Sequence, residues 1–217
     1  MIAIAWDVET CPLPEDTFSG PRQGRFEKEL TKQQERNPEM GREEASKRAR
    51  SFHPYLGWIT CISVVRGKVG GEMGTPFSWS ATAPEEEQAM LESFWSDLED
   101  LQGRPRWATY NGKDFDVPFL TARSSFHGVS PTQSDILDTY PFKHNPHADL
   151  SKIWLSVSSS LEEMCAHLGV ESPKEDGMDG GAVATAVSEG RMDEVEAYCE
   201  RDVVATFQCL SSLQWAL

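Results

Sequence analysis

The sequence lacks the features that would place a protein outside the soluble globular class. Its longest apolar stretch, Trp58–Val65, has the length of a strand and is far too short to span a bilayer. The first residues place no basic segment ahead of an apolar run, so we expect no signal peptide. With 39% hydrophobic and 25% charged residues, we expect one globular domain over residues 1–217 that makes no contact with a membrane.

Cysteine is sparse and irregularly spaced. The five cysteines are odd in number and never form a Cys-x-x-Cys pair. This pattern indicates reduced thiols and a cytoplasmic protein, with neither a disulfide framework nor a structural zinc site. His144, His147 and Asp149 resemble metal ligands, but they lie among prolines in a predicted loop, where we expect no zinc site.

Basic residues are also scarce, and the net charge is −15. Proteins that bind nucleic acid are usually basic, so this charge argues against tight, non-specific binding along a duplex. It is compatible with an enzyme that grips one strand end through bound cations. The segment from Arg22 to Arg50 is the exception, because its nine Lys and Arg and six Glu give it +3 and leave −18 for the rest of the chain.

This charged segment belongs to a predicted insertion at about 15–52. Phe26 and Leu30 are four residues apart, and Pro21, Pro38 and Gly41 interrupt the sequence, which predicts two surface helices. Two interpretations stay open. The insertion is either a solvated spacer or a basic element that guides nucleic acid or contacts a partner protein.

The remaining sequence alternates between strand and helix patterns. We predict strands at Ile2–Val8, Trp58–Val65, about 77–79 and 106–110. Predicted helices run from a capping box at Thr82–Glu85 to about 101, over about 115–126 and 160–168, and in two segments that end near 213. The stretch between the second and third of these helices is predicted to be irregular. Three strands, a helix, a strand and then helices predict an α/β fold with a mixed sheet flanked by helices.

Two carboxylates, Asp7 and Glu9, end the first predicted strand. Strand side chains alternate between faces, so both carboxylates point to the same side and can share a cation. An acidic pair alone is weak evidence in a chain with 35 acidic residues. The buried strand before it makes the pair more significant, because open α/β sheets bind ligands at strand ends.

A second motif, Asn111-Gly-Lys-Asp-Phe-Asp116, lies where a strand passes into a helix. Asn111 suits the turn, and Asp116 falls near a helix N-terminus, where a carboxylate is favoured even without a function. Asp114 competes for the same role.

The third motif, Tyr198-Cys-Glu-Arg-Asp202, lies on the last predicted helix. Tyr198 and Asp202 are four residues apart and therefore share a helix face. The apolar residues that follow must pack on the sheet, and a carboxylate on such a face is costly unless it is paired or bound to a metal. Pairing with a nearby Arg is the alternative.

Taken together and in this order, the motifs resemble those of the DEDDy-type 3′→5′ exonucleases, with their RNase H-like (DnaQ-like) fold. The sequence is most similar to stand-alone predicted exonucleases related to the exonuclease domain of family-B DNA polymerases. Asp7-Val-Glu-Thr10, Asn111-x-x-x-Phe-Asp116 and Tyr198-x-x-x-Asp202 carry the resemblance, together with Phe52-His-Pro54 and Ser160–Gly169. It spans nearly the whole chain except the charged insertion. Ala197 stands where the sister class has a histidine, which favours the tyrosine type.

The resemblance implies a catalytic site that contains Asp7, Glu9, Asp116, Tyr198 and Asp202. The four carboxylates would hold two divalent cations, Mg²⁺ or Mn²⁺, because these ions prefer oxygen ligands. Asp7 would bridge both ions, Glu9 and Asp202 would hold the water-activating ion, and Asp116 would support the second. Tyr198 would orient the attacking water.

Thr10, Asn111 and Phe115 are the candidate substrate-binding residues. The Thr10 hydroxyl could hydrogen-bond the terminal nucleotide, and the Phe115 ring could pack against a base. The expected substrate is single-stranded DNA with a free 3′ end. RNA or short oligonucleotides are the alternative, and a non-catalytic nucleic-acid-binding module is a further one. A replication or repair protein is a possible partner.

Overall fold

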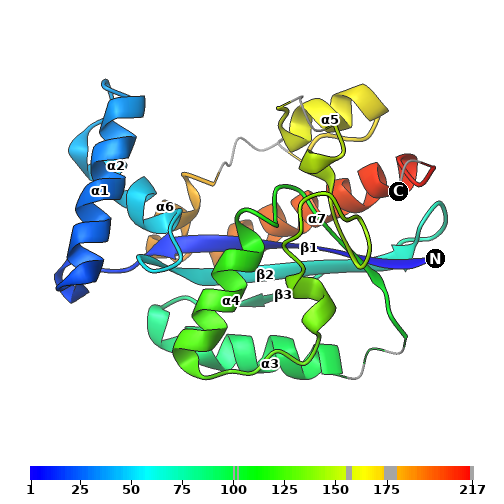
Figure 1. The fold of residues 1–217 in the computed structure, drawn as a ribbon, viewed down its shortest axis with the longest axis horizontal. Coiled ribbons are helices and arrows are strands. Elements are labelled where there is room, and N and C mark those ends of the chain that lie inside the picture. The colour runs from blue at the N-terminus through cyan, green and yellow to red at the C-terminus, as the bar shows by residue number, and fades with distance from the viewer. Residues whose placement is uncertain (100, 102, 155–157, 174–179, 216–217) are drawn as a thin grey trace.

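A five-stranded mixed sheet forms the centre of the protein (Figure 1). The computed structural model describes residues 1–99, 101, 103–154, 158–173 and 180–215. The strands lie in the order β3-β2-β1-β4-β5; β2 is antiparallel to β1 and β3, whereas β4 is parallel to β1 and β5 to β4. Their bounds are β1 Ile2–Pro12, β2 Gly57–Lys68, β3 Phe77–Ser80, β4 Arg106–Thr109 and β5 His147–Asp149. The predicted α/β class, a mixed sheet flanked by helices, is confirmed.

Helices surround this sheet. They are α1 Pro21–Arg36, α2 Arg42–Ser51, α3 Glu87–Glu99, α4 Asp116–His127, α5 Leu161–Leu168, α6 Val183–Ser188 and α7 Met192–Ser212. Short 3-10 turns lie at Glu15–Thr17, Pro84–Glu86, Ser134–Leu137 and Leu150–Lys152. Ser160 and Glu163 form a capping box at the start of α5, and Gly169 ends that helix in the left-handed conformation.

The predicted capping box at Thr82–Glu85 is wrong in its acidic partner. Glu86 accepts hydrogen bonds from both the backbone N–H and the hydroxyl of Thr82, each at 2.8 Å. A 3-10 turn, which has fewer residues per turn than an α-helix, precedes α3. The residue whose side chain returns to Thr82 is therefore Glu86 and not Glu85.

β1 is longer than predicted, so the acidic pair lies inside the strand and the prediction that it ends the strand is wrong. Pairing with β2 continues through Thr10, Cys11 and Pro12 after a register shift between Glu9 and Thr10. A bulge of this kind lets a strand bend without ending, because the ladder resumes on its far side. The pairing of β1 with β4 is much shorter and covers Ala3 to Ala5 alone.

β5 is the second departure from the prediction, which placed His144–Asp149 in a loop. His147–Asp149 pairs in parallel with Trp107–Thr109 of β4. The strand is short, so it has no apolar alternation that sequence reasoning can detect. Its pairing places Asp149 beside the end of β4, where the second motif begins.

Alternate residues of β1 pack against different helices. Ile4, Trp6 and Val8 join the core that includes α3 and α4. Ala3 and Ala5 join a second cluster with α5 and α7. Their small side chains allow α7 to lie close to the sheet, and the same alternation turns Asp7 and Glu9 toward α7.

α1 and α2 form the two predicted helices of the charged insertion, and they stand together at the end of the sheet away from the N-terminus (Figure 1). They have a small core of their own. The buried residues of this core are Phe18, Phe26, Leu30, Ala45, Ala49 and Leu56. The Thr10 hydroxyl donates a 2.7 Å hydrogen bond to the Ser51 carbonyl and so joins the end of α2 to β1.

All five cysteines are buried and free. In the described parts of the chain, none of the helices combines the length and apolar character that a membrane crossing requires. The acidic, Gly-containing segment 171–181 lies partly outside the described residues, which omit 174–179.

Candidate active site

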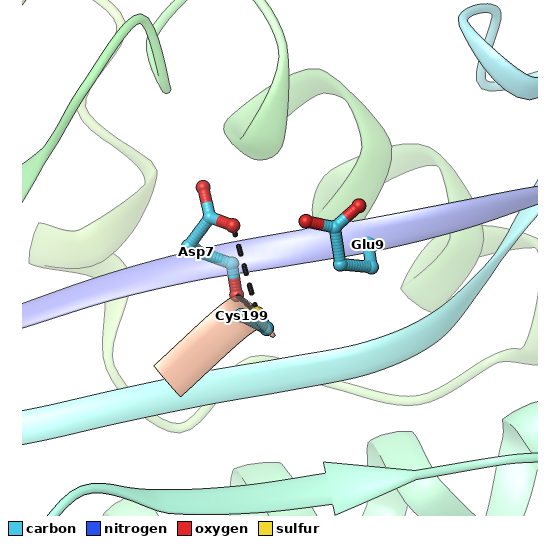
Figure 2. A group of neighbouring side chains, drawn as sticks. All are labelled: Asp7, Glu9 and Cys199. Atoms are coloured by element: carbon cyan, nitrogen blue, oxygen red, sulfur yellow. Dashed lines mark hydrogen bonds between the residues drawn. The ribbon is translucent and has the colours of Figure 1, made fainter. Parts of the chain in front are cut away.

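Asp7 and Glu9 lie on the same side of β1, beyond the point where β4 separates from it. Figure 2 shows both side chains on the strand, with Cys199 of α7 beside Asp7. Glu9 is buried and Asp7 is half-buried. The predicted alternation is therefore present, and the site forms where the two parallel strands diverge.

Asp116 fills the opening between the diverging strands. It is the first residue of α4 and is buried, and its Oδ1 accepts a 2.9 Å hydrogen bond from the Val8 backbone N–H. No β4 residue pairs with Val8, so the carboxylate replaces a carbonyl acceptor. Asp114, the competing residue, is exposed and forms an ion pair with Lys152. The structure thus brings Asp116, and not Asp114, to β1.

Tyr198 and Asp202 lie on α7 and join the cluster formed by the carboxylates of Asp7, Glu9 and Asp116. Tyr198 is buried, and a side-chain hydrogen bond joins it to Asp202 one helical turn later. Burial raises the pKa of the Tyr198 hydroxyl well above its ordinary value, and the charges of Glu9, Asp202 and Asp7 raise it further. Tyr198 is therefore a hydrogen-bond donor near neutral pH and unsuited to act as a base.

The four carboxylates lie close together with little access to water, so their negative charges repel one another. Burial raises the pKa of Asp7 well above its ordinary value, and Asp116, Glu9 and Asp202 add to the effect. Burial and Asp202 raise the pKa of Glu9 in the same way. Burial raises the pKa of Asp116 to about 7, although the hydrogen bond from Val8 opposes the shift. Like charges held this close are stable when a cation neutralises them.

Cys199 was not among the predicted site residues. Its Sγ lies 3.6 Å from Asp7 Oδ2 and 3.7 Å from the Asp7 carbonyl oxygen. Burial raises the pKa of the Cys199 thiol, so the thiol stays protonated and donates to Asp7. Helical spacing was the available signal, because Cys199 lies three residues before Asp202 on the face that meets the sheet.

Asp149 is a second functional residue that sequence reasoning missed. It is buried at the end of β5, and its Oδ1 accepts from the Asn111 N–H at 2.8 Å while Oδ2 accepts from the Lys113 N–H at 3.1 Å. Ser151 donates to Oδ1 through both its N–H and its hydroxyl. Asp149 therefore holds the loop that leads into Asp116. The sequence analysis placed Asp149 inside a predicted loop with His144 and His147, so this role was not recognised.

The 111–115 loop is held tightly on its other side as well. The Lys113 ammonium is buried and donates to the carbonyls of Tyr140 and Lys143, at 2.6 and 2.7 Å. Gly112 is required, because a Cβ there would lie 2.4 Å from the Thr109 side chain. Asn111 has a φ of 63°, a conformation that asparagine tolerates better than most residues.

The three candidate substrate-binding residues differ in their accessibility. The Thr10 side chain is buried and its hydroxyl already donates to Ser51. Asn111 is exposed at the start of the second motif. The half-buried ring of Phe115 packs against Phe52 and Phe119, with ring centroids 6.1 and 5.0 Å away.

The donor set suits a hard divalent cation. Ligand atoms of Asp7, Glu9 and Cys199 all lie within 4.8 Å of one another. The carboxylates of Asp116 and Asp202 raise the pKa of Asp7 from nearby, so oxygen donors surround this position. Oxygen-rich sites favour Mg²⁺ or Mn²⁺ over zinc. The residues present thus fit a divalent metal ion.

The sheet order, the helices on both faces and the acidic site between β1, α4 and α7 define an RNase H-like exonuclease fold. Residues 54–214 match the sequence profile of a family described as predicted 3′-5′ exonuclease related to the exonuclease domain of PolB. The chain belongs to this family. The match contains Asp116, Tyr198 and Asp202 and begins after Asp7 and Glu9.

A solved polymerase structure shows the same fold. The chain is similar to the family B DNA polymerase from the archaeon Pyrobaculum calidifontis, with a TM-score of 0.64 and 16% identity over 98% of this chain. It spans 24% of that polymerase. E. coli Exonuclease I in complex with a dT13 oligonucleotide aligns with a TM-score of 0.44 and 16% identity, over 98% of this chain and 41% of that one. A comparison with curated protein sequences returned no match.

Proposed function

We propose that the protein is a two-metal-ion exonuclease that removes nucleotides from the 3′ end of single-stranded DNA. Water adds to the phosphorus, and the bond from phosphorus to the 3′ oxygen breaks. A nucleoside 5′-monophosphate is released, and the remaining strand ends in a new 3′-hydroxyl. One observation carries this proposal: Asp116 on α4 and Asp202 on α7 lie close enough to Asp7 and Glu9 on β1 to raise the pKa of both carboxyl groups.

Asp7, Glu9, Asp116 and Asp202 are the residues that would hold two Mg²⁺ or Mn²⁺ ions. When bound, such cations activate water and neutralise the charge that develops on the phosphate and on the leaving oxygen. Asp7 is the central residue of the group, since the three other carboxylates all act on its pKa. Its position suits the role of a ligand shared between both ions.

The neighbouring side chains orient these ligands. The Tyr198 hydroxyl keeps its proton and would hold the attacking water in position rather than deprotonate it. The Cys199 thiol would fix the rotamer of Asp7 from the side of α7. The Val8 N–H does the same for Asp116 from the strand. These three donors leave the carboxylates few alternative conformations, which favours a preorganised site.

The preference for DNA is supported by the family description, which relates the chain to the exonuclease domain of PolB. Contacts to the sugar 2′ position distinguish RNA from DNA, and a direct test with both nucleic acids decides between them. The exposed Asn111 and the half-buried Phe115 are the candidate contacts to the terminal nucleotide. Thr10 is the least accessible of the three predicted residues, because its hydroxyl is already engaged.

The experiment compares DNA and RNA strands carrying a 5′ label, incubated with the protein and Mg²⁺ or Mn²⁺. We expect a ladder of products that shortens from the 3′ end of DNA, with mononucleotides released. Circular single strands should stay intact. Asp116→Ala should abolish activity, whereas the matched Asp114→Ala variant should keep it. Cleavage of circles, or full activity in Asp116→Ala, would refute the proposal.

A further inference from the structure

A hollow of about 480 Å³ lies between α2 and the start of α6. Both helices stand at the end of the sheet where β1 ends, as Figure 1 shows. Its volume falls in the range of small-molecule binding sites. The residues that line it include Lys47, Arg48, Phe52, Gly180, Ala184 and Thr185. α2 belongs to the charged insertion, which lies outside the part of the chain that matches the exonuclease family.

This hollow borders the candidate active site at two points. Ser51 lines the hollow, and its carbonyl accepts the hydrogen bond from Thr10, the residue after Glu9. The Phe52 ring lies edge-on to Phe115, the residue before Asp116, with centroids 6.1 Å apart. A strand whose 3′ end lies at the carboxylates therefore has the hollow directly beside it.

Phe52 supplies an accessible aromatic surface at this border. The residue is 41% exposed, so part of its ring is accessible to a ligand. Gly180 faces the ring, and even a Cβ at that position would stay 4.0 Å from it. Exposed aromatic rings beside a nuclease site stack on bases of single strands, whatever the base.

The cations of the hollow are held weakly. Lys47 pairs with Glu43 and Arg48 with Glu44, each at 3.2 Å on the exposed side of α2. Such surface pairs contribute little, so a phosphate can replace the glutamate at small cost. The Arg48 Nε is buried and, within the described chain, has no hydrogen-bond partner. Glu43 and Glu44 balance the charges of Lys47 and Arg48, so the hollow carries little net positive charge. It therefore suits a base and sugar with one phosphate better than a run of phosphates.

We propose that this hollow binds a nucleotide of the substrate strand upstream of the scissile bond, with Phe52 stacking on its base and Arg48 contacting its phosphate. The proposal rests on the exonuclease function proposed above and adds a specific binding role for the charged insertion. Aromatic stacking discriminates little between bases, so the site recognises single-stranded character rather than sequence.

The test compares a short oligothymidylate with the p-nitrophenyl ester of thymidine 5′-monophosphate, which has no upstream nucleotide. Phe52→Ala and Arg48→Gln should each raise KM for the oligonucleotide, by roughly ten-fold for the loss of a stacked base. Hydrolysis of the ester should stay unchanged in both variants, and Phe52→Trp should restore the oligonucleotide KM. Tyr55→Ala is the matched control, because Tyr55 is an exposed aromatic residue on the same segment that does not line the hollow.

The outcomes separate this proposal from the proposed function. If the unmodified protein hydrolyses neither substrate, the exonuclease function itself fails. An active enzyme with an unchanged oligonucleotide KM in Phe52→Ala would overturn the stacking role. Equal losses on both substrates in Phe52→Ala would also overturn it, because they would show that Phe52 acts by supporting Phe115 and the catalytic loop.

Discussion

Asp149 provides the sharpest test of how the site is held together. The replacement Asp149→Ala removes the acceptor of the Asn111 and Lys113 backbone N–H groups, which lie 2.8 and 3.1 Å from the carboxylate. A buried donor left without a partner costs about 1–3 kcal/mol, and the Lys113 N–H is buried whereas the Asn111 N–H is part-buried, so we expect a loss of about 2–5 kcal/mol in the free energy of unfolding. The loop that carries Asp116 would lose its fixed position.

The functional consequence follows from the sensitivity of catalysis to small displacements. A shift of about 1 Å in a catalytic group can cost roughly 100-fold in rate. We therefore expect kcat on single-stranded DNA to fall by roughly one to two orders of magnitude in Asp149→Ala and the Mn²⁺ concentration for half-maximal activity to rise. KM for the DNA strand should rise as well, since the same loop carries Asn111 and Phe115, the candidate contacts to the terminal nucleotide.

The assay measures kcat and metal dependence at a temperature where circular dichroism shows the variant to be folded. Ser151→Ala is the matched control, because it removes one hydroxyl partner of Asp149 and leaves both loop N–H groups bound. It should keep kcat within a few-fold of the unmodified protein. A folded Asp149→Ala variant with unchanged kcat and metal dependence would refute the positioning role.

Three further predictions concern buried ionisable side chains. Arg123→Met should cost about 3–5 kcal/mol of stability in urea unfolding, because it removes the guanidinium that lies 2.6 Å from fully buried Glu87 and leaves this carboxylate with only the Ile59 N–H and His127 as partners among the described residues. The raised carboxyl pKa values predict that the metal-free protein loses stability as the pH rises from about 4 through the pKa of about 7 at Asp116, because the folded state holds protons that the unfolded state has released. Thermal melting with and without Mg²⁺ measures the effect. Tyr198→Phe should lower kcat roughly ten-fold or more with stability changed by only about 1 kcal/mol, as single-turnover kinetics and melting will show.

Each of these has a matched control. Glu92→Gln, an exposed acid on α3, should leave urea unfolding unchanged, and a similarly small effect in Arg123→Met would contradict the account of the buried pair. Asp116→Asn should flatten the pH dependence of melting, and an unaltered slope would show that other groups cause it. Tyr140→Phe, an exposed tyrosine, should keep full activity. Full activity in Tyr198→Phe would remove its role in water orientation.

Local spacing in the sequence contained much of the site. Asp7 and Glu9 share a side because strand residues alternate, and Tyr198 and Asp202 share a face because they lie one helical turn apart. The two helices of the charged insertion were predicted from Phe26 and Leu30, which are indeed buried. These features depend on the backbone period alone, so distant residues do not alter them.

Other features depended on pairings between distant segments. β1 extends past its acidic pair because β2 continues to pair with it up to Pro12. β5 is too short to leave a pattern, so the role of Asp149 emerged only from its contacts with the 111–113 loop. The proximity of Phe52 to Phe115 likewise joins an insertion to a motif far along the chain.

The sequence by itself determined which carboxylates were available and which of them shared a face, because strand and helix periods set those relations locally. The motif spacing had selected Asp116 over Asp114, and only the tertiary structure showed how Asp116 joins them. The physical reason lies in the sheet: β4 stops pairing with β1 after Ala5, and the Val8 N–H beyond this point needs an acceptor. The Asp116 carboxylate supplies that acceptor at 2.9 Å, which places its charge beside Asp7.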